Sequence, residues 1–410
     1  MSPEARAALQ RQVSETLSVI DGGMGDRRPV RATPFAWREP AEIPPREWAY
    51  GKHYVRKYLS ATFAPGGVGK SSMAIVEALA MVTGRPLLGV APRQPLRVWL
   101  WNGEDPLEEI ERRVLAACLH YEITAAQIGD RLFIDSGRDC QIVVAEETKD
   151  GATIAEPVLS ELEATITLNA IDVWMFDPFI SCHAVSENDN NKIQRVVKAL
   201  AQLADKTNTA GELIHHVRKS SSAGRNEVTV EDGRGASALL AAVRTARALN
   251  PMTGEEATQF GVDPVRRAEY FRVSQGKANM SRATTHSAWR HMESVALGNG
   301  SAGLMQDTVG VVATWKPDDP LAEITPAEAL KVQMEIAKDE WRDDIRSPKW
   351  VGIVFGQVLD VDHRDPVIKS RIKQMVSDWM KSGRLKTETR HNTVTRKDKE
   401  CVIVGEWFDP

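Results

Sequence analysis

Short apolar runs alternate with segments of helical period across residues 58–217. The runs have the length and the bounding turns of buried strands, and they predict strands at residues 58–64, 96–102, 131–135, 171–177 and 212–217. Apolar side chains at a helical period predict helices at residues 70–83, 106–121 and 192–206. Strands that alternate with helices predict an α/β fold, in which helices cover both faces of a parallel sheet.

The pattern changes on both sides of this region. Residues 1–45 mix Pro, Arg, Gly and Glu without a sustained period, which predicts an arm with one short helix at residues 3–16. Beyond the last apolar run we expect a polar loop at residues 219–235, a helix at 237–249 and a strand at 270–274. These elements complete a core over residues 46–300, and the small residues that follow predict a linker at 301–319.

The last part of the chain, residues 320–410, has its own pattern. Helices are expected at residues 325–341, 350–359 and 366–382, and strands at 384–388 and 401–404. Three helices followed by a two-stranded hairpin predict a small α+β domain of the winged helix-turn-helix type.

Composition and charge narrow the class of protein. With 410 residues, 42% of them hydrophobic, the chain can form two domains. No apolar run is long enough for a membrane span, so we expect a cytoplasmic protein. The four cysteines are widely spaced, which predicts buried thiols with neither a disulfide framework nor a zinc site.

The net charge of −4 is distributed unevenly. Residues 318–344 hold nine acids and three bases, whereas residues 366–399 hold ten bases and three acids. Because nucleic-acid binding depends on where charge is placed and not on its sum, the basic C-terminal region keeps DNA as a candidate partner.

A glycine-rich turn joins the first expected strand of the core to its first expected helix. It matches the P-loop pattern, except that Ala64 stands where the stricter form has Gly. Backbone N–H groups at the start of the helix would surround phosphates, Lys70 would reach the β- and γ-phosphates, and the Ser71 hydroxyl would bind Mg²⁺. We therefore predict ATP and Mg²⁺ as cofactors. The expected nucleotide-binding residues are Ala64, Pro65, Gly66, Gly67, Val68, Gly69, Lys70, Ser71 and Ser72.

Two acidic residues follow expected strands and complete this chemistry. Asp177 ends an apolar run, which we place beside the P-loop strand, and it is the expected second Mg²⁺ ligand. Asp172 is its competitor but lies at the other end of that run. Glu104 follows the strand 96–102 and is the expected general base, the alternative being that it only favours the dipole of the next helix. Asp105 is the expected N-cap of that helix.

These motifs together resemble the RecA-type hexameric helicases, and in particular the plasmid RepA-type replicative helicases with their phage and mobile-element relatives. The resemblance rests on the P-loop, the Gly-Glu-Asp-Pro segment at 103–106, Asp177 and the strand that ends in His215 and His216. It continues through the segments 233–237 and 275–279 and covers residues 45–291. It implies a homo-oligomer, with a hexameric ring expected, that moves along DNA.

The resemblance also implies roles for single residues. His216 would sense the γ-phosphate, whereas a strand-end histidine with only local hydrogen bonds is the alternative. Arg244 would be an arginine finger for the neighbouring subunit, the alternative being an arginine on a helix surface, with Arg247 and Lys277 as substitutes. The loop at 219–234 would face DNA in the central channel, where the phosphate-contacting residues would be Lys219, Arg225 and Arg234.

The C-terminal residues lie outside the resemblance, since compact plasmid helicases end soon after the core. On the third expected helix an apolar stripe leaves Lys369, Arg371 and Lys373 outward. With Arg396 and Lys397 of the expected wing, they are candidate DNA contacts, and a winged fold that binds protein is the alternative.

These observations favour an ATP hydrolase that acts as a DNA helicase or translocase in the replication of a plasmid, phage or mobile element. The alternative is a DNA-bound regulatory ATPase that uses nucleotide as a switch and unwinds nothing. A non-catalytic scaffold would require Glu104, Asp177 and Arg244 all to be coincidental.

Overall fold

The computed structural model describes residues 32–148, 151–217, 227–232, 236–281, 287–301, 303–317, 321, 324–392 and 397–409. The chain divides into two compact units, Met1–Arg46 and Glu47–Pro410. In the first unit, the described residues contain one short 3-10 turn, η1 (Pro40–Glu42), and the exposed side chains of Phe35 and Trp37. The helix expected at residues 3–16 lies outside the described residues.

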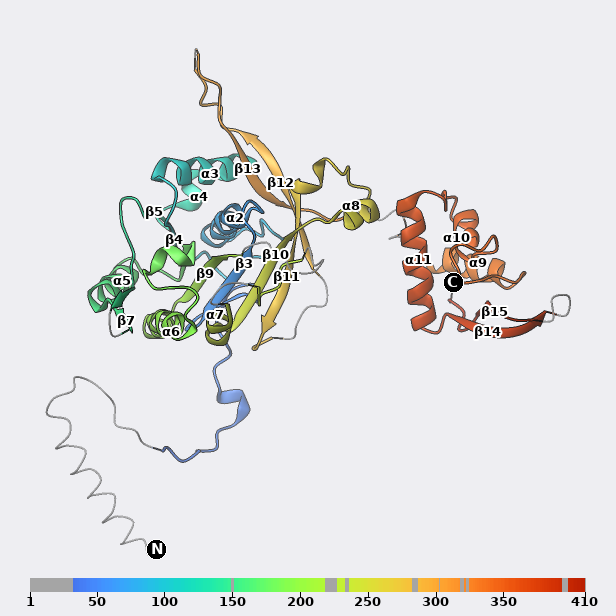
Figure 1. Ribbon diagram of the computed structural model, residues 1–410, viewed down its shortest axis with the longest axis horizontal. Helices are drawn as coiled ribbons and strands as arrows, with labels where there is room; N and C mark the ends of the chain where they lie inside the picture. The colour runs from blue at the N-terminus through green and yellow to red at the C-terminus, as the bar shows by residue number, and fades with distance from the viewer. Residues whose placement is uncertain are drawn as a thin grey trace, which may run out of the picture. The chain divides into compact units, whose positions relative to one another are not determined.

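A nine-stranded sheet forms the centre of the second unit (Figure 1). Its strand order is β13-β12-β11-β10-β3-β9-β8-β4-β5. The six strands from β10 to β5 run parallel, and the three at the other edge are antiparallel. The bounds are β3 (Leu59–Ala64), β4 (Val98–Asn102), β5 (Leu132–Ser136), β8 (Val173–Asp177), β9 (Ala210–His216), β10 (Thr245–Pro251), β11 (Tyr270–Ala278), β12 (Ala288–Ala296) and β13 (Thr308–Thr314).

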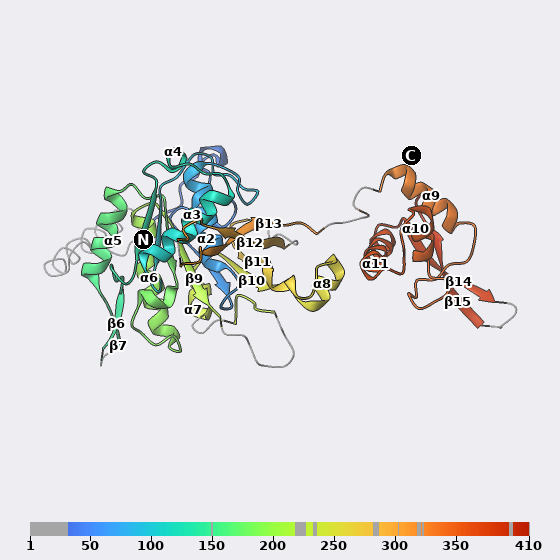
Figure 2. The ribbon, with the colours of Figure 1, turned by 90° about the horizontal axis from the view of Figure 1, so that it is seen from above.

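Helices cover both faces of this sheet, as the alternating pattern predicted (Figure 1). On one face the apolar side of α2 packs on β4 and β8, and on the other α6 packs on β3 and β8. Small hairpins lie outside the sheet, one of them beside α6 (Figure 2). The bounds of these elements are β1 (Trp48–Tyr50), β2 (Tyr54–Val55), α2 (Lys70–Thr83), α3 (Leu107–His120), α4 (Ala125–Ile128), β6 (Ala145–Thr148), β7 (Gly151–Ile154), α5 (Glu156–Leu168), η2 (Phe179–Cys182), α6 (Asn190–Lys206), α7 (Ala236–Ala242), α8 (Gly254–Phe260) and η3 (Arg266–Glu269).

The buried apolar runs explain why these strands form. β3 and β8 are buried along their whole length, so each can only be an interior strand covered on both faces. The expected strands and helices up to residue 217 are all present, and α2 begins and ends where the helical period predicted.

Two expectations beyond residue 217 differ from the structure. The helix expected at 237–249 ends at Ala242, and the chain then enters β10, which pairs with β3. The linker expected at 301–319 contains β13, which pairs with β12 and buries Val311 and Val312. Both segments are held by tertiary contacts that their local composition does not encode.

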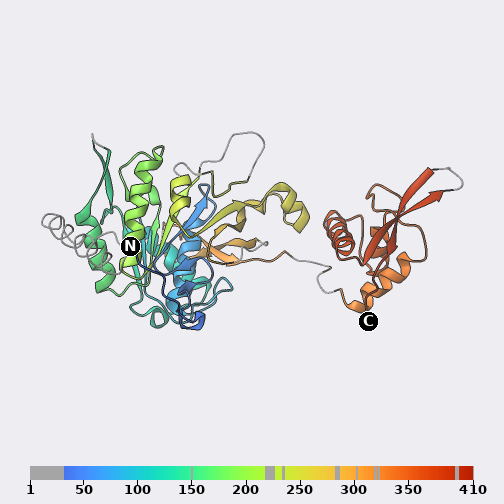
Figure 3. The same ribbon diagram turned by 90° about the horizontal axis from the view of Figure 1, so that it is seen from below.

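The C-terminal residues form three helices and one antiparallel hairpin in the expected order (Figure 3). Their buried side chains make a separate apolar cluster around Val332, Phe355 and Ile372. The bounds are α9 (Pro326–Ile336), α10 (Gly352–Val358), α11 (Pro366–Lys381), β14 (Leu385–Asn392) and β15 (Lys397–Val404). Within the described part of the chain, no helix is both long and apolar enough to cross a membrane.

Candidate functional site

The turn between β3 and α2 has the backbone that a P-loop requires. Gly67 and Gly69 have φ of 80° and 101°, in the left-handed region where a side chain is strained. A Cβ on Gly69 would also lie 2.9 Å from the Sδ of Met292. The Gly69 carbonyl accepts the first helical hydrogen bond, from the N–H of Met73 at 2.9 Å, so the free N–H groups of α2 start at Lys70. The turn therefore presents backbone donors and a largely buried Lys70 at one point.

The strand register brings the predicted residues to the same edge of the sheet. Ala64 at the end of β3 pairs with His216 at the end of β9, and Asn102 at the end of β4 pairs with Asp177 at the end of β8. One expectation was wrong, because β8 does not neighbour the P-loop strand: β9 lies between them. Ser71, in the first turn of α2, nevertheless lines the same small cavity as Asp177.

Asp177 is a buried carboxylate whose pKa is subject to opposing influences. Burial raises its pKa, and the nearby Lys70 ammonium and the hydrogen bond from Ser71 oppose that rise. Among the described residues, its Oδ1 atom is buried without a hydrogen-bond partner. A bound Mg²⁺ would satisfy this oxygen, so the pair Ser71 and Asp177 fits the metal that a P-loop requires.

The metal would take its other ligands from outside the protein. The described part of the chain contains no group of three or more His, Cys, Asp or Glu side chains that could hold an ion. Mg²⁺ commonly binds through one or two protein oxygens, with phosphates and water completing an octahedron. The two protein oxygens, from Ser71 and Asp177, are therefore suited to Mg²⁺ that is bound as a complex with a nucleotide.

Glu104 and His216 also meet at this edge. The Glu104 carboxylate is 57% exposed and lies 3.9 Å from the Nε2 of His216. Burial and the Lys70 charge lower the pKa of His216, so the imidazole is neutral at neutral pH. His215, by contrast, points inward, is buried, and packs its ring against Phe63, as strand alternation predicted.

Two further acidic residues had expected positions: Asp105 as the N-cap of α3, which was wrong, and Asp172 at the far end of the Asp177 strand, which is confirmed. Asp105 does not cap α3, because its carboxylate binds the Nη1 of Arg113 at 2.7 Å and Pro106 occupies the cap position. Asp172 lies at the opposite end of β8 and pairs with Arg56. It is therefore placed away from the P-loop edge, as expected.

The candidate arginine finger lies elsewhere. Arg244 is not on a helix: it stands between α7 and β10, with its guanidinium carbon 5.6 Å from the ring centroid of Tyr58. Its N–H donates to the carbonyl of Leu59, at the beginning of β3 and hence at the edge opposite the P-loop. Arg247, the first substitute, is buried and paired with Glu77 at 2.6 Å.

The structure places only some of the candidate DNA contacts. Lys373 is exposed on α11, Lys369 is half-buried with its ammonium 5.9 Å from the ring centroid of Trp350, and Arg371 is half-buried. Lys397 begins β15. The remaining candidates, Lys219, Arg225, Arg234 and Arg396, lie outside the described residues.

Sequence reasoning missed side chains that line the site without belonging to a motif. Arg113 and Asn102 border a small cavity together with Ser71 and Asp177. An arginine on a helix and an asparagine at a strand end carry no distinctive spacing, so only the folded arrangement identifies them. The exposed Cys140 also differs from the expectation of buried thiols, since Cys118, Cys182 and Cys401 are the buried ones.

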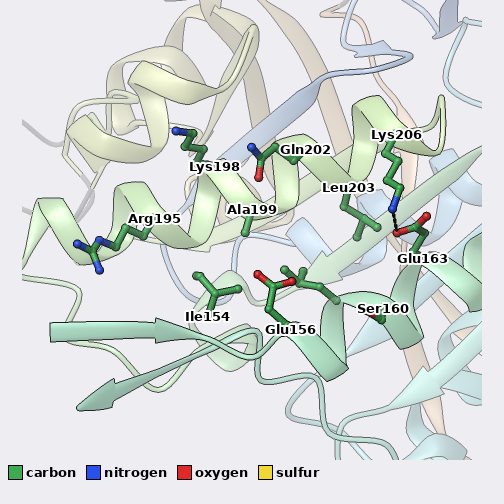
Figure 4. Close-up of a pocket in the computed structure, with 11 residues that line it drawn as sticks. Ile154, Glu156, Ser160, Glu163, Arg195, Lys198, Ala199, Gln202, Leu203 and Lys206 are labelled. Atoms are coloured by element: carbon green, nitrogen blue, oxygen red, sulfur yellow. Dashed lines mark hydrogen bonds and ion pairs between the residues drawn. The ribbon is translucent and has the colours of Figure 1, made fainter. Parts of the chain in front are cut away.

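A larger pocket of about 450 Å³ lies between α5 and α6, and none of the predicted site residues lines it (Figure 4). Figure 4 shows Lys206 of α6 joined to Glu163 of α5 across it, at 2.7 Å. Its lining mixes exposed charged side chains such as Glu156 and Lys198 with the buried apolar side chains of Ala199 and Leu203, and its oppositely charged rim is typical of a solvated helix surface.

Comparison with known proteins agrees with this site. Residues 26–222 match the model of a family described as an AAA domain. Among solved structures, the crystal structure of the RadB recombinase matches at 14% identity, with 58% of this chain and 89% of that chain covered and a TM-score of 0.38. The family match spans the P-loop turn, Glu104, Asp177 and His216, whose strands β3, β4, β8 and β9 run parallel in one sheet.

Proposed function

We propose that this chain is an ATP-dependent DNA helicase or translocase of the RepA type that hydrolyses ATP at the interfaces of a homo-oligomeric ring. The observation that carries the proposal is the convergence of Lys70, Ser71, Glu104, Asp177 and His216 at one edge of the sheet. A role in the replication of a plasmid, phage or mobile element follows from the sequence resemblance.

Each of these side chains has a role that suits its position. Lys70 and the N–H groups of α2 bind the phosphates, and Ser71 and Asp177 would hold Mg²⁺, which would supply positive charge beside them. Glu104, exposed at the tip of its turn, orients and deprotonates the attacking water. His216, neutral and 3.9 Å from Glu104, detects the loss of the γ-phosphate and passes it to the segment that follows β9.

The position of Arg244 supports a site that is shared between subunits. The residue lies at the amino ends of β3 and β10, opposite this chain's own P-loop. It cannot reach the phosphates bound in its own subunit, so a catalytic Arg244 acts in a neighbour. In a ring, each subunit could place the sheet edge that carries Arg244 against the P-loop of the next subunit, so that Arg244 acts in a neighbour.

The C-terminal residues support DNA as the partner. The order of three helices and a hairpin is that of a winged helix, and the Val402 N–H donates to the carbonyl of Trp341 at 2.8 Å, which forms an isolated antiparallel bridge beside the hairpin. The exposed Lys373 and Lys386 lie on α11 and β14, the elements that would serve as recognition helix and wing.

The test combines three measurements on the full chain: ATP turnover with and without single-stranded DNA, displacement of a labelled strand from a forked duplex, and mass in ATP. We expect DNA-stimulated turnover, displacement that requires hydrolysable ATP, and a ring-sized mass. A Glu104→Gln variant is the matched control for hydrolysis. Turnover with no strand displacement or movement would instead identify a regulatory ATPase, and no turnover at all would contradict the proposal.

A further inference from the structure

The turn that carries Glu104 has an unusual set of backbone contacts. Asn102 Oδ1 accepts hydrogen bonds from two successive N–H groups, that of Glu104 at 2.9 Å and that of Asp105 at 2.8 Å. One side chain at the end of β4 therefore holds both amides of the turn.

The carbonyls of the same two residues are bound by side chains of β5 and of the turn that follows it. Arg138 Nε donates to the carbonyl of Glu104 at 2.9 Å, and Ser136 Oγ donates to the carbonyl of Asp105 at 2.7 Å. Ser136 is the last residue of β5, which pairs with β4 in parallel. All four backbone polar groups of Glu104 and Asp105 are thus bound by side chains.

The residues on either side of the turn leave it little room to move. The Gly103 N–H donates to the carbonyl of Asp177 at 2.8 Å, and the Gly137 N–H donates to the carbonyl of Asn102 at 2.7 Å. A Cβ on Gly103 would lie 2.4 Å from the Cβ of Ser181, and one on Gly137 would lie 2.7 Å from the Cα of Gly103. The ends of β5, β4 and β8 therefore pack directly against one another.

These contacts exceed what a connection between a strand and a helix requires. Surface loops usually satisfy their backbone groups with water. A solvent-exposed side chain has few packing contacts to hold it in place. Its reacting atom is therefore positioned only if the backbone that carries it is rigid. Glu104 is such a side chain, 57% exposed on a turn in which the backbone polar groups of Glu104 and Asp105 are all bound.

We propose that Asn102, Ser136 and Arg138 form a clamp that positions the Glu104 carboxylate for attack by water. The clamp rests on the proposed function, since it assigns positioning residues to the same hydrolytic site. It acts through Glu104, because each of its side chains binds the backbone of the turn that carries this carboxylate. Asn102 ends β4, Ser136 ends β5 and Arg138 lies in the turn after β5, and none of them belongs to a recognised motif.

The test is a double-mutant cycle between Asn102 and Glu104 in ATP turnover by the full chain. Asn102→Leu removes the acceptor at similar volume, and Asn102→Asp keeps it. Asn169→Leu is the control, because the Asn169 side chain likewise bonds local backbone, the Thr165 carbonyl at 3.0 Å, but lies at the end of α5. We expect Asn102→Leu to lower kcat about 10- to 100-fold, with KM for ATP within about twofold, as misplacement of a reacting group does. Asn102→Asp should recover most of kcat, and Asn169→Leu should leave it unchanged.

The double-mutant cycle distinguishes a loss of Glu104 positioning from a nonspecific loss of activity. In a Glu104→Gln background, Asn102→Leu should change the residual rate by less than about twofold, because the group it positions is already absent. An equal loss in both backgrounds, or an Asn102→Leu enzyme within about twofold of the parent, overturns the clamp. If Asn102→Leu fails to fold, Arg138→Met, which removes an exposed donor, completes the same cycle. A parent enzyme without Glu104-dependent turnover refutes the proposed function itself, and the clamp with it, before any clamp variant is measured.

Discussion

The Glu104 carboxylate and the His216 imidazole lie 3.9 Å apart, although one follows β4 and the other ends β9. The pKa of His216 is lowered by burial and by Lys70, so this contact is polar and not a pair of full charges at neutral pH. The proposed base and the proposed sensor are therefore adjacent without a full ion pair between them.

Lys70 and Glu104 should fail in different ways, because one binds phosphate and the other acts on water. Lys70→Ala should weaken ATP binding and abolish turnover. Glu104→Gln should keep ATP bound while slowing hydrolysis by about 10²-fold or more, as loss of a general base does. Nucleotide affinity by fluorescence titration and single-turnover hydrolysis separate the two effects. If Glu104→Gln hydrolyses ATP at the parental rate, the base must be another residue.

Arg244 should be needed by the neighbouring subunit and not by its own. Arg244→Ala should reduce turnover by about 10³-fold or more while ATP affinity stays nearly intact, because a trans finger stabilises only the transition state. Mixing it with Lys70→Ala should restore part of the activity, since each inactive subunit supplies what the other lacks. The absence of recovery, in mixtures shown by mass to exchange subunits, would count against the shared site.

The first half of the fold was predictable because its signal is local. β3 and β8 are apolar runs between turns, and α2 follows the P-loop glycines directly. The second half carries a weaker signal. The segment around residues 237–249 is rich in Ala and Leu, which favour a helix, yet its second part forms β10. Pairing of β10 with β3 and β11 decides the outcome, and such pairing is not visible in composition.

In the candidate site, too, some features were predictable from local sequence and others were not. Glu104 and Asp177 could be found because each lies at or just after the end of an apolar run, whereas the role of His216 came from the family resemblance. That β9 lies between the strands of the P-loop and Asp177 could not be found, because strand order is a property of the whole sheet. The sequence also offered no means to separate Arg244 from Arg247, whereas burial against Glu77 does so directly.

Arg247 should therefore be a stability residue. Its guanidinium binds both oxygens of Glu77, each at 2.6 Å, and donates to Thr62 Oγ1 at 2.8 Å, all in the core. Arg247→Leu leaves the Glu77 carboxylate buried without its cation and should lower the free energy of unfolding by about 3–5 kcal/mol. Arg247→Leu combined with Glu77→Leu should be less destabilising than Arg247→Leu alone. Urea denaturation at one protein concentration measures both, and a single-variant loss below about 1 kcal/mol would mean that the pair does not support the core.

The C-terminal fragment, residues 318–410, should fold alone and bind duplex DNA. Its own apolar cluster supports folding, and the ten bases and three acids of residues 366–399 support binding. If α11 and the hairpin bind about four phosphates, the logarithm of the binding constant should fall with the logarithm of salt at a slope near −3.6, as counterions are released. Neutralising Arg396 and Lys397 should flatten the slope by about 1 for each phosphate that the variant no longer binds.

Lys338→Gln is the matched control for that fragment, because it removes one exposed positive charge from a lysine that is already paired with Glu335 on α9. It should leave the slope unchanged if the DNA surface consists of α11 and the hairpin. A loss of affinity equal to that of the hairpin variants would mean that net charge, and not a defined surface, attracts the DNA. A folded fragment that binds no duplex at low salt would instead assign these residues to protein contact, and the ATPase core would then have to engage DNA without them.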